Sequence, residues 1–219
     1  FGLTTRDRQP KDSFHVVQRQ YQIAPHFALP AAPKQSEGGP RVPKVSVVVA
    51  TYNGSRTLPS CLESLARLNY ADYEVILVDD GSTDGTPAVI ADFKLQIADL
   101  SAPASVGNLQ SAICNPQFIF LRQTNQGLAA ARNAGIRAAT GEIVAFTDDD
   151  CRADEDWLYY LVNDLLRSDF VGLGGHNFLP PEDSRVAAAV MVSPGGPAHV
   201  LLTDTEAEHI PGCNMAFYK

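Results

Sequence analysis

From about residue 44 onward, short uninterrupted apolar runs alternate with longer segments of helical periodicity. Apolar runs rich in β-branched residues are typical of strands that are buried on both faces. Five strands are expected, in "KVSVVVATYN", "YEVILVDDGS", "QFIFLRQ", "EIVAFTDDD" and "FVGLGG". Apolar residues three or four positions apart predict four helices, in "SRTLPSCLESLARL", "TPAVIADFKLQIADL", "NQGLAAARNAGIRAATG" and "DEDWLYYLVNDLLRS".

This alternation of strand and helix predicts an α/β fold with a Rossmann-like, mainly parallel sheet that is flanked by helices. Parallel strands that follow one another need right-handed crossovers, and the predicted helices provide them. In such sheets, ligands bind beyond the carboxyl ends of the strands. Functional residues are therefore expected where the predicted strands end.

Other parts of the chain lack this alternation of strand and helix patterns. Residues 1–43 are rich in proline and have little periodicity, which predicts an N-terminal extension or linker before a domain at 44–219. Residues 101–116 are expected to be loop-rich, and the pattern fades again from His176. The chain begins at Phe1 and stops at Lys219. We expect a piece of a longer protein, truncated at its C-terminus.

Composition narrows the class of protein. A chain of 219 residues that is 45% hydrophobic can bury one sizeable core. The net charge of −8 gives no basic surface for nucleic acid. The four cysteines form no C-x-x-C pair, which argues against a zinc site or a disulfide framework and fits a reducing compartment.

The apolar pattern also bears on the cellular compartment of the protein. The longest apolar runs, "VSVVVA" and "VAAAVMV", are too short to span a bilayer, and no secretory signal is visible. We expect a cytoplasmic protein without a membrane span in this chain. The inner face of the membrane is the alternative location if a longer chain carries a membrane segment.

Polar residues cluster where three predicted strands end, in "ATYN", "VDDGSTD" and "FTDDD". No G-x-G-x-x-G or Walker A motif is present to cradle phosphates. A divalent cation is the other common way to hold a diphosphate, since Mg²⁺ and Mn²⁺ take one or two carboxylates together with phosphate oxygens and water. Asp148, Asp149 and Asp150 supply such carboxylates, although a solvated turn beside a helix cap is the plainer alternative.

A different task is predicted for Asp79 and Asp80. An ionised carboxylate only accepts hydrogen bonds, which suits the N3–H of uracil or thymine, or the hydroxyls of a ribose. Gly81 lets the chain turn tightly after the strand. Ser82, Thr83 and Asp84 can then cap the next helix.

Four segments in a fixed order carry a family resemblance: "VSVVVATYNGSRTLPSCLESL", "VILVDDGSTDGT", "NQGLAAARNAGIRAATGEIVAFTDDDC" and "PGCNMAF". Together they closely resemble glycosyltransferase family 2, whose members are inverting enzymes of the GT-A fold that use nucleotide-diphosphate sugars. The resemblance runs from about Val45 to Lys219. It does not extend to the first 43 residues.

The resemblance implies roles for individual positions. The implied nucleotide-binding set is Thr51, Tyr52, Asn53, Asp79, Asp80, Asn125, Gly127, Arg132, Asn133, Asp148 and Asp149. Thr51 and Tyr52 would line the base pocket, and Arg132 would meet the base-binding aspartate or a phosphate. Asp148 and Asp150 form the family's Asp-x-Asp, and the implied Mn²⁺ or Mg²⁺ would be bound by Asp150 together with Asp148. The "GCNMAF" segment would lie under the donor sugar or on the acceptor side.

The same resemblance implies a mechanism and its missing part. A metal would stabilise the departing nucleoside diphosphate, and a general base would deprotonate the acceptor hydroxyl. In the family that base lies in a later motif, which is expected beyond Lys219. The chain as given should therefore bind donor but transfer sugar poorly or not at all. The acceptor, whether a saccharide, a lipid or a protein, is not identified by the sequence.

Two rival functions stay open at this point. A sugar-1-phosphate nucleotidyltransferase of the same fold would need a loop rich in glycine and arginine plus a lysine after the first strand, and only Gly54 and Arg56 are present there. A non-catalytic nucleotide-sugar-binding domain is the rival from another class. A downstream Glu-Asp and a tryptophan motif in a longer chain would favour the enzyme over that domain.

Overall fold

The structure, a computed structural model, describes residues 42–100, 116–175 and 212–219, together with the isolated positions 177, 184, 186 and 189. The predictions for residues 1–41, for most of the loop-rich segment 101–116 and for His176 fall outside the described residues. The domain boundary near residue 43 therefore stays a prediction. No helix in the described ranges combines the length and apolar character needed to cross a bilayer.

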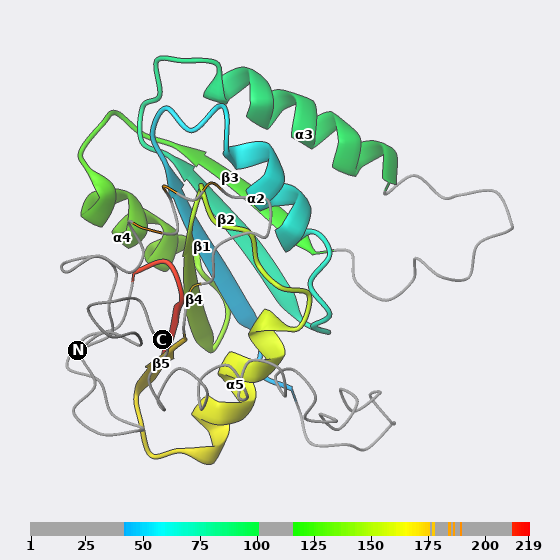
Figure 1. The fold of residues 1–219 in the computed structure, drawn as a ribbon, viewed down its shortest axis with the longest axis vertical. Helices are drawn as coiled ribbons and strands as arrows, with labels where there is room; N and C mark the ends of the chain where they lie inside the picture. The colour runs from blue at the N-terminus through cyan, green and yellow to red at the C-terminus, as the bar shows by residue number, and fades with distance from the viewer. Residues whose placement is uncertain are drawn as a thin grey trace, which may run out of the picture. The chain divides into compact units, whose positions relative to one another are not determined.

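Within the described residues, six strands form one sheet in the order β3-β2-β1-β4-β6-β5 (Figure 1). The strands are β1 (Val45–Thr51), β2 (Tyr73–Asp79), β3 (Gln117–Arg122), β4 (Ile143–Asp148), β5 (Gly172–Gly174) and β6 (Met215–Tyr218). The pairs β1–β2, β1–β4 and β2–β3 are parallel, as the alternation of strand and helix predicted.

The strand β6 was not predicted from the sequence. It pairs antiparallel with β4 on one side and with β5 on the other, so the sheet is mainly but not wholly parallel. Its four residues, "MAFY", are too few to show a periodicity. Pairing with the buried edge of β4 makes them a strand, and that pairing is a tertiary effect.

In the continuous ranges that the structure describes, four helices cover the two faces of the sheet: α2 (Leu58–Leu65), α3 (Thr86–Leu100), α4 (Leu128–Ala138) and α5 (Trp157–Arg167). Side chains of α2, α3 and α5 share one apolar cluster on one face, and α4 packs in a second cluster on the other. Figure 1 shows α4 apart from α2 and α3 in this arrangement. The α4 backbone approaches β1 closely, because a Cβ on Gly135 would lie 2.3 Å from Val48 Cγ1.

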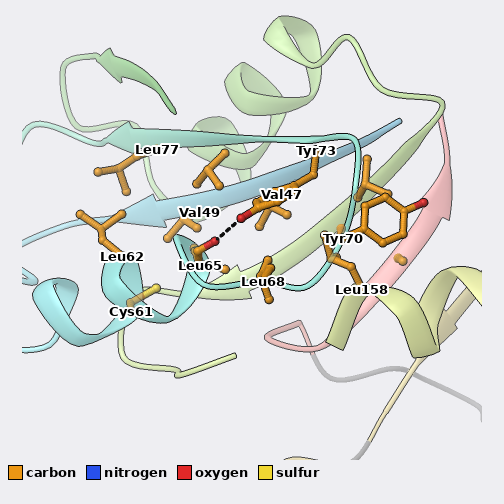
Figure 2. Packing of buried hydrophobic residues seen from close by; sticks show 14 of the residues in the cluster. Val47, Val49, Cys61, Leu62, Leu65, Leu68, Tyr70, Tyr73, Leu77 and Leu158 are labelled. Atoms are coloured by element: carbon orange, nitrogen blue, oxygen red, sulfur yellow. Dashed lines mark hydrogen bonds between the residues drawn. The ribbon is translucent and has the colours of Figure 1, made fainter. Parts of the chain in front are cut away.

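The larger cluster contains side chains of both β1 and α2 and packs the helix against the strand. Val47, Val49, Leu62 and Leu65 are fully buried there (Figure 2). Each such side chain contributes about 1.5–3 kcal/mol relative to exposure. The Tyr73 hydroxyl donates a hydrogen bond to the Leu65 carbonyl oxygen at 2.8 Å. Val49 near the end of β1 and Leu58 at the start of α2 are both fully buried, so the loop between them is held at both ends at the carboxyl edge of the sheet.

Candidate functional site at the carboxyl edge of the sheet

The ends of β1, β2 and β4 lie side by side at one edge of the sheet. In the strand register, Thr51 is opposite Asp79 and Ala50 is opposite Asp148. The loops that follow these strands carry most of the predicted site residues. The parallel topology therefore brings together side chains that are up to about 100 positions apart in the sequence.

Asp79 closes β2 and is held by two neighbours. Its side chain is buried, and its Oδ1 accepts a hydrogen bond from the backbone N–H of Ser82 at 2.8 Å. Its Oδ2 lies 3.5 Å from Nε of Arg122 at the end of β3. Asp79 thus stabilises the turn after β2 and ties it to the neighbouring strand.

Asp80 is buried as well, at 3% exposure, and anchors the loop between β3 and α4. Its Oδ1 accepts from Nε2 of Gln123 at 2.7 Å and from the N–H of Gln126 at 3.0 Å, and its Oδ2 accepts from the N–H of Gly127 at 2.7 Å. Burial by itself raises the pKa of Asp80, but these three hydrogen bonds outweigh it and leave the pKa below its usual range. The carboxylate is therefore ionised and engaged within the protein, and a direct contact with a base stays a prediction.

The turn after β2 packs against this loop. Gly81 has φ of +76°, and a Cβ there would lie 2.7 Å from the backbone nitrogen of Asn125. Glycine is needed for both reasons, which agrees with the tight turn expected from the sequence. Asp84 accepts from the N–H of Thr86 at 2.9 Å at the start of α3 and from the N–H of Ser55 at 3.2 Å.

Asn53 joins the loops after β1 and β2. Its Oδ1 accepts from the N–H groups of Thr83 at 2.8 Å and Asp84 at 3.2 Å, while its own N–H donates to the Ser82 hydroxyl at 2.9 Å. Asn53 also has φ of +58°, a left-handed conformation that asparagine tolerates better than most residues. The neighbouring Tyr52 is 51% exposed.

The three consecutive aspartates have different environments. Asp148 Oδ1 accepts from Nη2 of Arg132 at 2.8 Å. Asp149 Oδ2 accepts from the Thr51 hydroxyl. Asp150 is exposed, and its Oδ1 accepts from the Cys151 thiol at 3.6 Å. The run thus offers one solvent-facing carboxylate and two that are bound by protein groups.

Asp149 is half-buried, and this affects its ionisation. Burial raises its pKa, the hydrogen bond from Thr51 opposes that rise, and the charges of Asp150 and Asp148 add to it. The net effect is a pKa above the usual aspartate range, so the charged form that a cation ligand needs is less favoured at Asp149 than at a fully solvated aspartate.

Arg132 links α4 to two other parts of the edge. Besides Asp148, its Nη2 donates to the Gly212 carbonyl oxygen at 3.0 Å, and its guanidinium lies 5.9 Å from the ring centroid of Phe146. Of the two options predicted for Arg132, an aspartate partner is present, but it is Asp148 at the end of β4 rather than Asp80. The segment at Gly212 is thereby placed beside the aspartate run.

The remaining predicted positions surround the Asp80 loop. Asn125 and Gly127 are exposed within it, and Asn133 is exposed on α4. Gly127, with φ of +88°, occupies the N-cap of α4. These three positions are available to a ligand, and none of the hydrogen bonds described above uses the side chain of Asn125 or Asn133.

The donor set fits a divalent cation that arrives with a diphosphate. Within the described residues, no three His, Cys, Asp or Glu side chains are arranged to hold a metal by themselves. Mg²⁺ and Mn²⁺ commonly bind through one or two carboxylates, with substrate phosphates and water completing the coordination. The exposed carboxylate of Asp150 meets that requirement, whereas a dedicated protein-only metal site would not be built this way.

Sequence reasoning missed several residues of this edge. Gln123 and Gln126 hold Asp80, and no motif marks them. The indole N–H of Trp157 donates to Oδ1 of Asn214 at 2.8 Å, so Trp157 packs against the core and also anchors the chain before β6. Nothing in the sequence shows that position 54 must be a glycine, although a Cβ there would collide with the Asp149 carboxylate.

Comparison with known proteins gives one family. The sequence model of glycosyl transferase family 2 matches residues 46–217. An uncharacterized glycosyltransferase of Nostoc sp. is 37% identical over 137 residues, which cover 61% of this chain and 36% of the relative. The chain thus spans about a third of the length of that relative.

Two solved structures have a similar fold. A mannosyltransferase of Pyrobaculum calidifontis, in complex with GDP-Man and Mn²⁺, has a TM-score of 0.56 and 25% identity, over 81% of this chain and 45% of that one. Residues 1–349 of TarS from S. aureus give a TM-score of 0.52 and 19% identity, over 80% of this chain and 47% of that one. The second likeness concerns the fold alone. Together they confirm the predicted GT-A architecture.

Proposed function

Because the chain belongs to glycosyl transferase family 2, we propose that it binds a uridine-diphosphate sugar with a divalent cation and serves inverting transfer of the sugar to an acceptor hydroxyl. The observation that carries the proposal is the carboxyl edge of the sheet. Three strand ends converge there, and Asp150 is the solvent-facing carboxylate of its run. No described residue is assigned as the general base.

The contacts of Asp150 and Asp148 decide which role we propose for each carboxylate. Asp150 is the cation ligand, since its carboxylate is not paired with a cationic side chain of the described residues. When bound, the cation would act as a Lewis acid toward the diphosphate that leaves the sugar. Asp148 is assigned to the ribose rather than to the metal, because Arg132 already compensates its charge.

The nucleobase of the donor is proposed to lie between the loop after β1 and the loop between β3 and α4. Tyr52 offers an exposed aromatic ring for stacking, and the loop that Asp80 holds offers Asn125 as a polar contact. Asp79 and Asp80 can only accept hydrogen bonds while ionised, which favours the N3–H of uracil. The mannosyltransferase of P. calidifontis was solved with a guanosine donor and Mn²⁺, which supports the cation and makes GDP a necessary comparison.

Calorimetric titration with UDP, GDP and dTDP, in Mn²⁺ and in EDTA, tests the proposal. UDP should bind at least tenfold more tightly in Mn²⁺, a difference of about 1.4 kcal/mol. Asp150→Ala should abolish that difference, while Asp169→Ala, an exposed acid beyond α5, should keep it. UDP binding that ignores both the metal and the Asp150 substitution would contradict the proposal. Tighter binding of GDP or dTDP would overturn the uridine assignment alone.

A further inference from the structure

The aspartate run includes a contact that joins β1 to β4 and that the proposed function does not use. Asp149 Oδ2 accepts a hydrogen bond from the hydroxyl of Thr51, the last residue of β1. Thr51 is 2% exposed, so the contact is shielded from water on the β1 side. A hydrogen bond to an ionised group in such a place contributes more than one on the surface.

Gly54 shows that this contact is closely fitted. A Cβ on Gly54 would lie 2.1 Å from Asp149 Oδ2 and 2.6 Å from the Thr51 hydroxyl oxygen. Any side chain at position 54 would therefore displace one of the two hydrogen-bonded groups. Its φ is not in the left-handed region, so the need for glycine here is one of space.

Asp149 also occupies a turn that determines where Asp150 points. The N–H of Cys151 donates to the Asp148 carbonyl oxygen at 3.1 Å, which closes a turn with Asp149 and Asp150 as its central residues. The Cys61 thiol approaches the same carbonyl oxygen at 3.5 Å. With one central side chain of the turn bonded to β1, the other is directed to solvent.

We propose that Thr51, Asp149 and Gly54 form a latch that positions the turn of residues 148–151. The latch orients the Asp150 carboxylate toward solvent, where it can bind the cation. In this arrangement Asp149 is a positioning residue and touches neither the nucleotide nor the metal. Thr51 acts through Asp149 rather than by lining the base pocket. The inference rests on the proposed metal-dependent binding of a nucleoside diphosphate.

The test is the ratio of the UDP dissociation constants in EDTA and in Mn²⁺, measured by calorimetry. Thr51→Val removes the hydroxyl at almost constant volume and should lower the ratio about tenfold, the low end for groups that orient a metal ligand. Thr51→Ser keeps the hydroxyl and should retain the ratio of the unchanged chain. If Thr51 contacted only the base, both dissociation constants would change together and the ratio would stay the same, which would overturn the latch.

A double-mutant cycle separates the latch from two independent effects. Asp149→Ala should lower the ratio by as much as Thr51→Val does, because each substitution removes the same contact. The double variant should lower the ratio no further than Thr51→Val alone. Additive losses would contradict the inference. Circular dichroism establishes folding, and if Thr51→Val does not fold, Gly54→Ala tests the same contact with the same expected loss.

The two proposals fail in different ways. A ratio of one in the unchanged chain would overturn the proposed function itself. A high ratio in the unchanged chain that survives in Thr51→Val would overturn the latch alone.

Discussion

Three consecutive aspartates differ in chemistry because their neighbours differ. Arg132 from α4 compensates the charge of Asp148, and Thr51 from β1 binds Asp149. Asp150 faces solvent. A repeated residue type therefore does not imply a shared role, and the contacts of each carboxylate decide which one can receive a cation.

Glu74 is a carboxylate with a structural task at the opposite edge of the sheet. Its Oε1 accepts from the Ser46 hydroxyl at 2.6 Å and the Thr140 N–H at 2.7 Å, and its Oε2 lies 3.0 Å from Nζ of Lys44. Burial by itself raises the pKa of Glu74, but these hydrogen bonds outweigh it and lower the pKa to about 2.

The depressed pKa of Glu74 predicts a pH-dependent contribution to stability. The ionised form is favoured by folding, so its contribution is present above the unfolded value of about 4.3 and is lost as the pH falls toward 2. Glu74→Gln should lower the free energy of unfolding by roughly 1–3 kcal/mol at pH 7 and by less at pH 3. Urea denaturation at both pH values measures this. An exposed control, Glu63→Gln, should show little change, and an equal loss for Glu74→Gln at both pH values would contradict the account.

At the scale of elements, the packing of α4 on β1 sets the position of Arg132 and Gly127. Gly135→Ala should destabilise the protein by about 1–3 kcal/mol, because the new methyl group would overlap Val48, although alanine is the better helix former. Thermal and urea unfolding measure the loss. Adding Val48→Ala makes room for the methyl group, so the double variant should lose less than the sum of the single ones; simple additivity would argue against this contact.

Most of these elements follow from sequence patterns, and the exceptions have a common cause. The strands β1, β2 and β4 are predictable because continuous burial on both faces requires unbroken apolar runs. The strand β6 is not predictable, because its four residues become a strand only by pairing with β4. The partners of Asp80 were missed for the same reason, since Gln123 and Gln126 meet it only when the β3–α4 loop packs on β2.

At the scale of the whole molecule, the two edges of the sheet are chemically distinct. β2 carries Glu74 near its amino end and Asp79 at its carboxyl end, with Asp80 directly after it, and each end joins neighbouring segments through buried carboxylates. The ends of a seven-residue strand are roughly 20 Å apart. A ligand at the carboxyl edge is therefore well separated from the residues that contact Glu74. A measurement that locates bound metal can distinguish these two edges of the sheet.

The most direct test of the central claim is the location of Mn²⁺ in the presence of UDP. Substoichiometric Mn²⁺ should broaden the amide NMR signals of residues 148–151 first, with those near Gly212 following, since Arg132 joins the two segments. Signals of Glu74 and Ser46 should keep their intensity, and Mg²⁺, which is diamagnetic, should broaden none. Broadening centred away from the aspartate run, or unchanged in Asp150→Ala, would contradict a metal-assisted nucleotide site at this edge.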